Sequence, residues 1–459
     1  MTLRWKLYRM LSFKKTKKLN VTRLIALVFA AIILLGALLL MLPVSSRNGI
    51  SCGFIPALFT ATSATCVTGL VLYDTWSQWS GLGQIVILSL IQLGGLGFMS
   101  VASLAIFAFR KKVGLKQRMV MAQALSMDDM EGVVRLQKWV LTGSLLIEFA
   151  GAMILTLRFL PEYGLLTGLK WGFFHAITAF CNAGFDIFGV LSPGSSLILF
   201  NGDPVVLLTL SAMVILGGLG FFVWEEVIRV RSLGKCSVYT RLVLVMTGIL
   251  LVFGTVMICL CEWKNPGTLG DMPVWQKILN AFFQAVTSRT AGFAAIDQGM
   301  LSDAGKAVTM ILMFVGGSSG STAGGVKTVT ILVLFLFIWA RARGRSTVGV
   351  FRRTVPGEKV MDAATIVLIM LTLAIFGSIV ISMTSPVSFV DSLFETVSAL
   401  STTGVTAGAT GKLSLISQLL IIVYMYFGRV GVLTISLGFL MGKQVEERFH
   451  YAQTNLLIG

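Results

Sequence analysis

Val67-Thr68-Gly69-Leu70 is the first of four similar stretches that recur along this 459-residue chain. The other three are Asn182-Ala183-Gly184-Phe185, Thr290-Ala291-Gly292-Phe293 and Thr402-Thr403-Gly404-Val405. Their glycines are separated by 115, 108 and 112 residues. A phenylalanine precedes each glycine by ten residues, at Phe59, Phe174, Phe282 and Phe394. This matched spacing indicates four internal repeats of the same supersecondary unit.

Apolar segments of two lengths surround these stretches, and in each repeat two long segments enclose a shorter one. The long segments are 22–42, 84–108, 138–158, 204–228, 242–262, 306–340, 361–383 and 414–441, and the short ones are 55–66, 170–181, 274–287 and 389–400. About twenty apolar residues span a bilayer, so the short segments must enter and leave on one side. The predicted fold is an all-α membrane protein, with eight transmembrane helices and four re-entrant pore helices around one pseudo-fourfold pore.

The distribution of charge predicts the orientation of the chain. Hydrophobic residues make up 56% of the chain and charged residues 12%, with a formal net charge of +17. Basic residues cluster in alternate connections, at 4–23, 110–118, 229–241, 341–359 and 443–448. The other connections hold acidic residues, at Asp74, Asp186, Asp203, Asp271, Asp297 and Asp303. This is the positive-inside pattern. It predicts a multi-pass protein with both termini in the cytoplasm, and it argues against nucleic-acid binding.

These boundaries divide the chain into six regions. We expect a cytoplasmic basic N-terminus at 1–20, pore repeats at 21–109, 110–232, 233–343 and 344–442, and a cytoplasmic C-terminus at 443–459.

The four glycine stretches have the composition of an ion selectivity filter. Extended backbone at membrane depth is tolerated where it lines a cavity, and a ring of carbonyl oxygens can replace the water shell of K⁺. Glycine supplies the positive φ that such a backbone needs. The predicted filter residues, and the only predicted K⁺ sites, are Val67, Thr68, Gly69, Asn182, Ala183, Gly184, Thr290, Ala291, Gly292, Thr402, Thr403 and Gly404. The alternative is that these glycines serve close helix packing.

The third repeat contains a run that cannot form a stable helix at low cost. It reads Gly316-Gly317-Ser318-Ser319-Gly320-Ser321-Thr322-Ala323-Gly324-Gly325 and is followed by Lys327. We expect an intramembrane loop below the filter that gates the pore, with a passive kink as the alternative. The run lacks the context of a nucleotide-binding P-loop.

Two arginines lie near the predicted pore. Arg429 is in the middle of the last long segment, where a charge is costly and predicts function. We expect it below the filter, where it raises the barrier to cations and takes part in gating; the alternative is a structural pair with a carboxylate or with loop carbonyls. For Arg289 we expect a side chain that points to the outer vestibule or to Glu395.

Taken together, the four stretches, the loop at 316–325 and Arg429 closely resemble the Trk/Ktr/HKT superfamily of K⁺ transporters, and within it the KtrB-type pore subunits. The resemblance extends from about residue 20 to the end of the chain. It implies K⁺ uptake that is stimulated by Na⁺, with moderate selectivity. Glycine rather than serine at Gly69 favours K⁺ in this family.

The resemblance also implies partners. KtrB-type subunits form homodimers on a cytosolic octameric ring of KtrA-type subunits that binds ATP, ADP or NAD-type nucleotides and controls the loop. This chain itself shows no nucleotide site. The basic loops and residues 451–459 are the expected contact surfaces, and a bacterial cell membrane is the expected location.

Two other functions remain as alternatives. A secondary carrier, such as a Na⁺/K⁺ symporter with broken helices, would need a buried acidic site; we expect none, because Glu148, Glu225 and Glu226 are explained as snorkelling side chains near helix ends. An enzyme would need a catalytic cluster. The two histidines and six cysteines show no such spacing, and His175 is expected to be structural.

Overall fold

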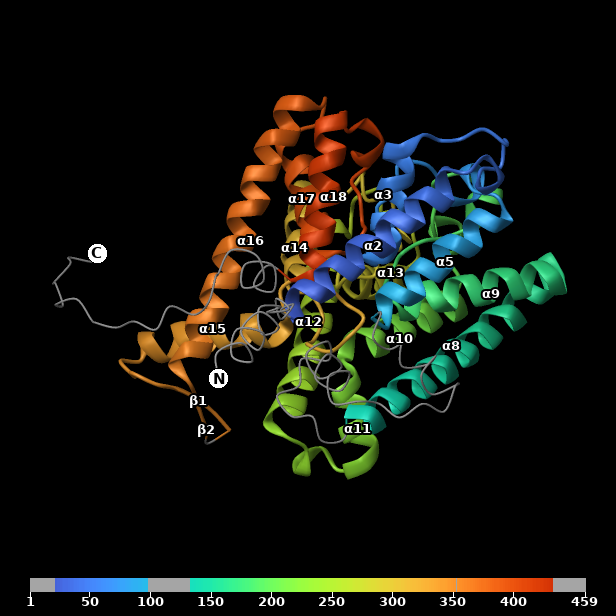
Figure 1. The fold of residues 1–459 in the computed structure, drawn as a ribbon. Helices are drawn as coiled ribbons and strands as arrows, with labels where there is room; N and C mark the ends of the chain where they lie inside the picture. The colour runs from blue at the N-terminus through green and yellow to red at the C-terminus, as the bar shows by residue number, and fades with distance from the viewer. Residues whose placement is uncertain (1–20, 98–132, 352, 432–459) are drawn as a thin grey trace, which may run out of the picture.

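The computed structural model describes residues 21–97, 133–351 and 353–431, and this part of the chain is mostly helical (Figure 1). The expected cytoplasmic termini, the basic cluster at 110–118, and the ends of the long segments 84–108 and 414–441 lie wholly or partly outside the described residues. So does the proposed contact surface at 451–459.

Four helices in the described part are long and apolar enough to cross a membrane alone. They are α2 (Val21–Met41), α8 (Val133–Tyr163), α12 (Val238–Glu262) and α16 (Gly357–Thr384). They coincide with the first long segment expected in each repeat. Large apolar side chains such as Leu35, Leu146, Leu260 and Leu368 are exposed on them. Such surfaces suit lipid, because an apolar environment removes the hydrophobic cost of exposure.

Four shorter helices follow these long helices and pack against them. They are α3 (Phe54–Thr65), α9 (Leu165–Phe180), α13 (Val274–Thr287) and α17 (Phe389–Ser401). All four coincide with the predicted short segments, and each ends just before one of the four glycine stretches. Small buried side chains, including Ala57, Ala61 and Ala64 on α3, allow close packing at the centre.

The second long segments are less regular. They contain α5 (Gly81–Gly95), α10 (Pro204–Leu219) with α11 (Phe221–Val230), α14 (Asp303–Phe314) with α15 (Thr328–Ala342), and α18 (Leu415–Val430). The loop between α14 and α15 was expected. The expectation that 204–228 forms one continuous helix was wrong, because α10 and α11 are bent by 94° at Gly220. Gly220 has φ 96°, which a right-handed helix cannot contain.

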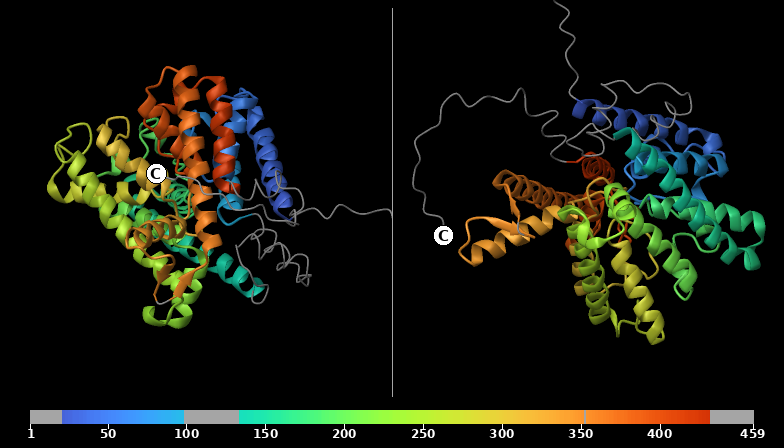
Figure 2. Two further views of the ribbon diagram at one scale, coloured as in Figure 1. Left: turned by 90° about the vertical axis from the view of Figure 1, so that its left-hand side faces the viewer. Right: turned by 90° about the horizontal axis from the view of Figure 1, so that it is seen from below.

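The remaining elements are short. They are α4 (Thr75–Gln78), the 3₁₀ helices η1 (Pro43–Ser45), η2 (Phe188–Val190), η3 (Ile198–Phe200), η4 (Leu233–Lys235) and η5 (Thr410–Lys412), and the strands β1 (Val348–Val350) and β2 (Arg353–Val355). The strands form an antiparallel hairpin in which Val348 pairs with Val355. This hairpin was not part of the all-α prediction. Figure 2 shows α15 running outward from the other helices toward it.

Candidate functional site

The four glycine stretches share an unusual backbone in which the φ angle changes sign. Each glycine has positive φ: Gly69 94°, Gly184 66°, Gly292 89° and Gly404 88°. The residue two positions earlier also has positive φ: Val67 57°, Asn182 58°, Thr290 71° and Thr402 51°. Left-handed backbone costs about 1–3 kcal/mol for a residue with a side chain and persists where the surroundings impose it, most often at functional sites.

The ends of the short helices impose this backbone. In three repeats the residue before the glycine donates its N–H to a carbonyl five positions back: Thr68 to Ser63 (2.8 Å), Ala183 to Thr178 (2.7 Å) and Thr403 to Ser398 (2.8 Å). This bond and the left-handed residue before it are those of a Schellman motif. The hydroxyls of Ser63 and Ser398 also accept the N–H groups of Gly69 and Gly404 (3.0 and 3.1 Å). The short helices therefore bind these N–H groups, and none of these bonds uses a carbonyl oxygen of the stretches.

The stretches surround one centre in cyclic order. A Cβ atom added to Gly69 would lie 2.6 Å from the carbonyl oxygen of Ala183, and one on Gly184 would lie 2.6 Å from that of Ala291. The same holds for Gly292 and the Thr403 oxygen (2.7 Å), and a Cβ on Gly404 would overlap the Thr68 oxygen. The first stretch thus neighbours the second, the second the third, the third the fourth, and the fourth the first. All twelve residues predicted from the sequence are brought together, and side chains at the four glycines would collide with carbonyl oxygens.

A cavity of about 310 Å³ opens on one side of this ring. The four glycines line it together with Asp74, Asp186 and Asp297. Burial, and next the nearby charge of Asp74, raise the pKa of Asp186 to about 7. From the sequence, these aspartates predicted only the orientation of the chain. Their position directly or shortly after the first, second and third glycine stretches was the signal that could have placed them here.

Polar side chains on the short helices hold the chain that leaves the ring. His175 receives the N–H of Ile187 on Nε2 (3.3 Å) and stacks on Phe188, so its geometry is that of a structural residue. Gln284 and Gln298 exchange two amide hydrogen bonds of 2.7 and 2.9 Å.

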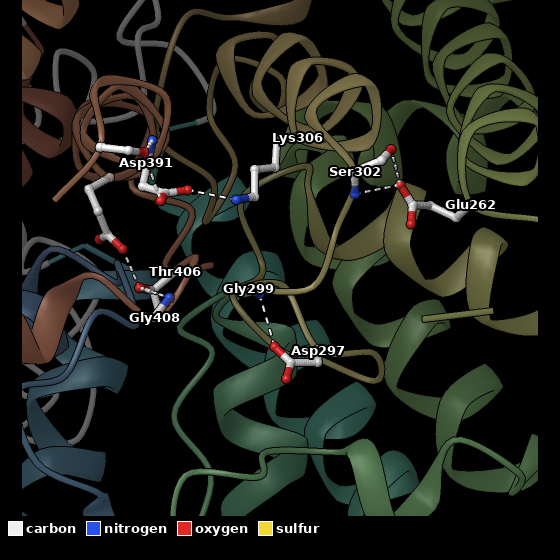
Figure 3. A network of polar contacts seen from close by, with 10 residues as sticks. Glu262, Asp297, Gly299, Ser302, Lys306, Asp391, Thr406 and Gly408 are labelled. Atoms are coloured by element: carbon white, nitrogen blue, oxygen red, sulfur yellow. Dashed lines mark hydrogen bonds and ion pairs between the residues drawn. The ribbon is translucent and has the colours of Figure 1, made fainter. Parts of the chain in front are cut away.

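In the fourth repeat, Glu395 binds the chain that follows the glycine stretch, because it accepts hydrogen bonds from Thr406 and from Thr410 (2.9 Å). Figure 3 shows this region, including the ion pair between Lys306 of α14 and Asp391 of α17 (2.7 Å). The second, third and fourth repeats leave the ring through different polar contacts, so these contacts could not be derived from the repeat pattern.

The loop at 316–325 contacts residues that precede the glycines, whereas the cavity is lined by the glycines and by residues that follow them. The two ends of the loop meet where Gly316 donates its N–H to Val326 (2.9 Å). The Thr322 hydroxyl donates to the carbonyl of Phe180, the last residue of α9 (3.1 Å). A Cβ on Gly324 would collide with the Thr402 side chain. The loop therefore occupies the space next to the second and fourth stretches, and its glycines allow that close approach.

The loop also contacts the break between α10 and α11. Phe221 donates its N–H to Gly320 (2.8 Å), and Ser318 donates its N–H to Gly218 (3.0 Å). The Tyr239 hydroxyl donates to the carbonyl of Ser319 (3.1 Å). The stretch Gly217-Gly218-Leu219-Gly220, at the end of α10, thus forms the surface against which the loop packs.

Arg429 bridges the loop and the end of another helix. Its guanidinium donates to the carbonyls of Thr322 and Gly94, and to that of Gly95 at 3.0 Å. A cation at the C-terminal end of α5 is favoured by the helix dipole. Lys327 donates to the Ala323 carbonyl (2.8 Å), so a second cation contacts the loop. Of the two structural alternatives for Arg429, the pairing with loop carbonyls is the one present.

Two predictions about charged residues were wrong. Arg289 does not reach Glu395; it is 8% exposed and donates to the hydroxyl of Thr328 on the loop side (3.4 Å). Helix α13 ends at Thr287, and Arg289, just past that end, contacts Thr328, the first residue of α15. Glu148 is not a snorkelling residue, because it is 5% exposed and accepts from Gln92 (3.0 Å). For both residues, the sequence indicated the position along the membrane segment but not the neighbouring groups that the side chain faces.

Comparison with known proteins supplies the family. Residues 17–449 match the family described as "TrkH: Cation transport protein". The chain is 38% identical to the potassium/sodium uptake protein NtpJ of Enterococcus hirae over 96% of this chain and 98% of the relative. It is 39% identical to the Ktr system potassium uptake protein B of Bacillus subtilis over 93% and 94%.

A solved structure supports the fold. The potassium transporter TrkH of Vibrio parahaemolyticus aligns with a TM-score of 0.72 at 16% identity, covering 94% of this chain and 86% of that one. With a family match over almost the whole length, this chain belongs to the TrkH family of cation transport proteins.

Proposed function

We propose that this protein takes up K⁺ across the cell membrane through a filter of backbone carbonyls at the four glycine stretches. The observation that carries the proposal is the cyclic order in which each glycine abuts a carbonyl oxygen of the next stretch. Carbonyl oxygens at such positions can coordinate a dehydrated monovalent cation. The names of the relatives, which are potassium or potassium/sodium uptake proteins, agree with this substrate.

In this proposal each repeat contributes two transmembrane helices and one pore helix to a single pore. The cavity with Asp74, Asp186 and Asp297 is the outer vestibule, where negative charge raises the local concentration of cations. Both termini then lie in the cytoplasm of a bacterial cell. The domains of the protein are then the six regions defined from the sequence.

We further propose that the loop at 316–325 is the gate. Its contacts with Phe180 and with the Thr402 side chain support a position directly below the filter, and Arg429 binds it through the Thr322 carbonyl. A cytosolic ring of nucleotide-binding subunits would control it in a homodimer of this chain, and Na⁺ would stimulate uptake. The bend at Gly220 supports such control, because α11 begins at the hydrogen bond from Phe221 to Gly320 of the loop and leads to the expected cytoplasmic side.

A secondary carrier is the second candidate, and one observation favours it. Glu148 is a carboxylate buried in the middle of α8, and no cation pairs with it within the described residues. Buried acids of this kind are common sites of proton or Na⁺ coupling.

The test is ⁸⁶Rb⁺ uptake into liposomes that contain the purified chain, with K⁺, Na⁺ and Li⁺ as competitors. The proposal expects inhibition by K⁺ and weaker inhibition by Na⁺. Deletion of 316–325 should raise uptake without any partner, and the deletion can be closed because Val315 and Val326 already pair. No uptake by either form would contradict the pore, and uptake that requires a Na⁺ or pH gradient and is lost in Glu148→Gln would favour the carrier.

A further inference from the structure

Arg289 is a buried cation for which the filter and the gate proposed above give no role. Its side chain is 8% exposed at the end of α13, and no carboxylate pairs with it within the described residues. Its Nε has no hydrogen-bond partner. Burying a guanidinium without a counter-charge is unfavourable, so retention at such a site points to a function.

The cavity beside Arg289 is too small for a ligand larger than one water molecule. The cavity beside it is about 10 Å³ and is lined by residues of α10, α12, α13 and the loop, including Gly218, Leu251 and Gly317. That volume is at the lower limit for one water molecule. The guanidinium therefore acts on protein groups around it.

Arg289 contacts Thr328, and Thr328 is hydrogen-bonded to the first two residues of the loop. Arg289 donates to the hydroxyl oxygen of Thr328 (3.4 Å). That hydroxyl donates its proton to the Gly316 carbonyl (2.9 Å), and the Thr328 N–H donates to the Gly317 carbonyl (3.1 Å). A cation that donates to a hydroxyl strengthens the bond that the hydroxyl donates in turn.

Arg289 is also joined covalently to the ring, because the next residue is Thr290. The Thr290 hydroxyl contacts the side-chain amide of Asn182 in the neighbouring stretch (3.3 Å). A displacement of the loop at Gly316 would thus be transmitted through one side chain to the third stretch.

We propose that Arg289 is a positioning residue of the gate, which holds the N-terminal end of the loop closed through the Thr328 hydroxyl and links it to the third filter stretch. This role is separate from that of Arg429, which binds the loop at Thr322. It rests on the proposed function of the loop as a gate.

The experiment is partner-free ⁸⁶Rb⁺ uptake by Arg289→Gln and by Thr328→Val, each in the full chain and in the chain that lacks 316–325. In the full chain we expect each variant to raise uptake about tenfold, which corresponds to a weak hydrogen bond to a charged group. The double variant should add little to either one, because both remove the same contact. Without the loop, neither substitution should change uptake.

Two controls separate positioning from folding. Thr328→Ser keeps the hydroxyl and should retain low uptake. Lys277→Gln removes a cation of α13 that is as buried as Arg289, 8% exposed, but its Nζ donates to the carbonyls of Trp263 and Gly270, which are not part of the loop. It should leave uptake unchanged.

The outcomes distinguish the two proposals. If the loop deletion raises uptake but Arg289→Gln does not, the inference about Arg289 is wrong and the gate stands. If Arg289→Gln lowers uptake equally with and without the loop, Arg289 serves the filter or the fold and not the gate. If the loop deletion itself leaves uptake unchanged, both proposals fail.

Discussion

Replacement of Gly69 by serine should reduce the preference for K⁺ over Na⁺ about 5- to 30-fold. Gly69 has φ 94°, where a residue with a side chain costs about 1–2 kcal/mol. The new Cβ would lie 2.6 Å from the Ala183 oxygen, so the two groups must separate by about 0.9 Å to reach an ordinary contact of ~3.5 Å. Either change moves a carbonyl that faces the proposed ion site. At 1.4 kcal/mol per factor of ten, a loss of about 1–2 kcal/mol gives the stated range.

The assay is the concentration of Na⁺ that halves ⁸⁶Rb⁺ uptake into liposomes, relative to the corresponding concentration of K⁺. Gly53→Ser is the matched control, because Gly53 has φ 84° but nothing within 4 Å of its Cβ position. It carries the backbone strain without displacing a carbonyl, so its ratio should equal that of the unchanged chain. An unaltered ratio in a folded Gly69→Ser protein would refute the assignment of the first stretch to the filter.

Two further predictions concern the groups around the ring. Uptake at subsaturating K⁺ should fall as external pH drops below about 7. The Asp186 carboxyl, whose pKa is raised to about 7, is charged above that pH and neutral below it, so the vestibule loses negative charge. Asp186→Asn should lower uptake at pH 8 and flatten this profile, and an unchanged profile would remove Asp186 from the ion path. Glu395→Gln should destabilise the protein by about 1–3 kcal/mol, since Thr406 and Thr410 donate to different carboxylate oxygens and an amide replaces one of these oxygens with an NH₂ donor. A lower midpoint of thermal unfolding in detergent would register this loss, with Glu358→Gln, an exposed glutamate on α16, as the control.

Much of the fold could be predicted from local sequence. The long helix α12 and the short helix α13 coincide with the expected segments 242–262 and 274–287, since apolar length and flanking turn residues are local properties. The interruption between α14 and α15 was also predicted, because a run of Gly, Ser and Thr disfavours helix wherever it lies. The bend at Gly220 was missed, because glycines within an apolar run are compatible with a helix until their neighbours impose another φ, and α10 does continue through Gly217 and Gly218.

The twelve residues of the ring were selected by repetition, a property of the sequence alone. Four glycines at similar spacing need a common explanation, and positive φ combined with close approach supplies it. By contrast, the partners of Arg429, Arg289 and Glu148 come from segments 39 to 335 residues away. No periodicity encodes which of many distant groups a long side chain will meet.

The sequence by itself indicated helices long and apolar enough to cross a membrane, a glycine-containing stretch that recurs four times, and a Gly/Ser/Thr run that interrupts a long segment. These follow from composition, apolar length and backbone preference, all of which act over a few residues. The tertiary structure decided the cyclic order of the stretches, the seat of the loop against the break at Gly220, and the choice of loop carbonyls as partners of Arg429. Those depend on packing between segments that are remote in the chain, where geometry and the need to satisfy buried polar groups select one arrangement.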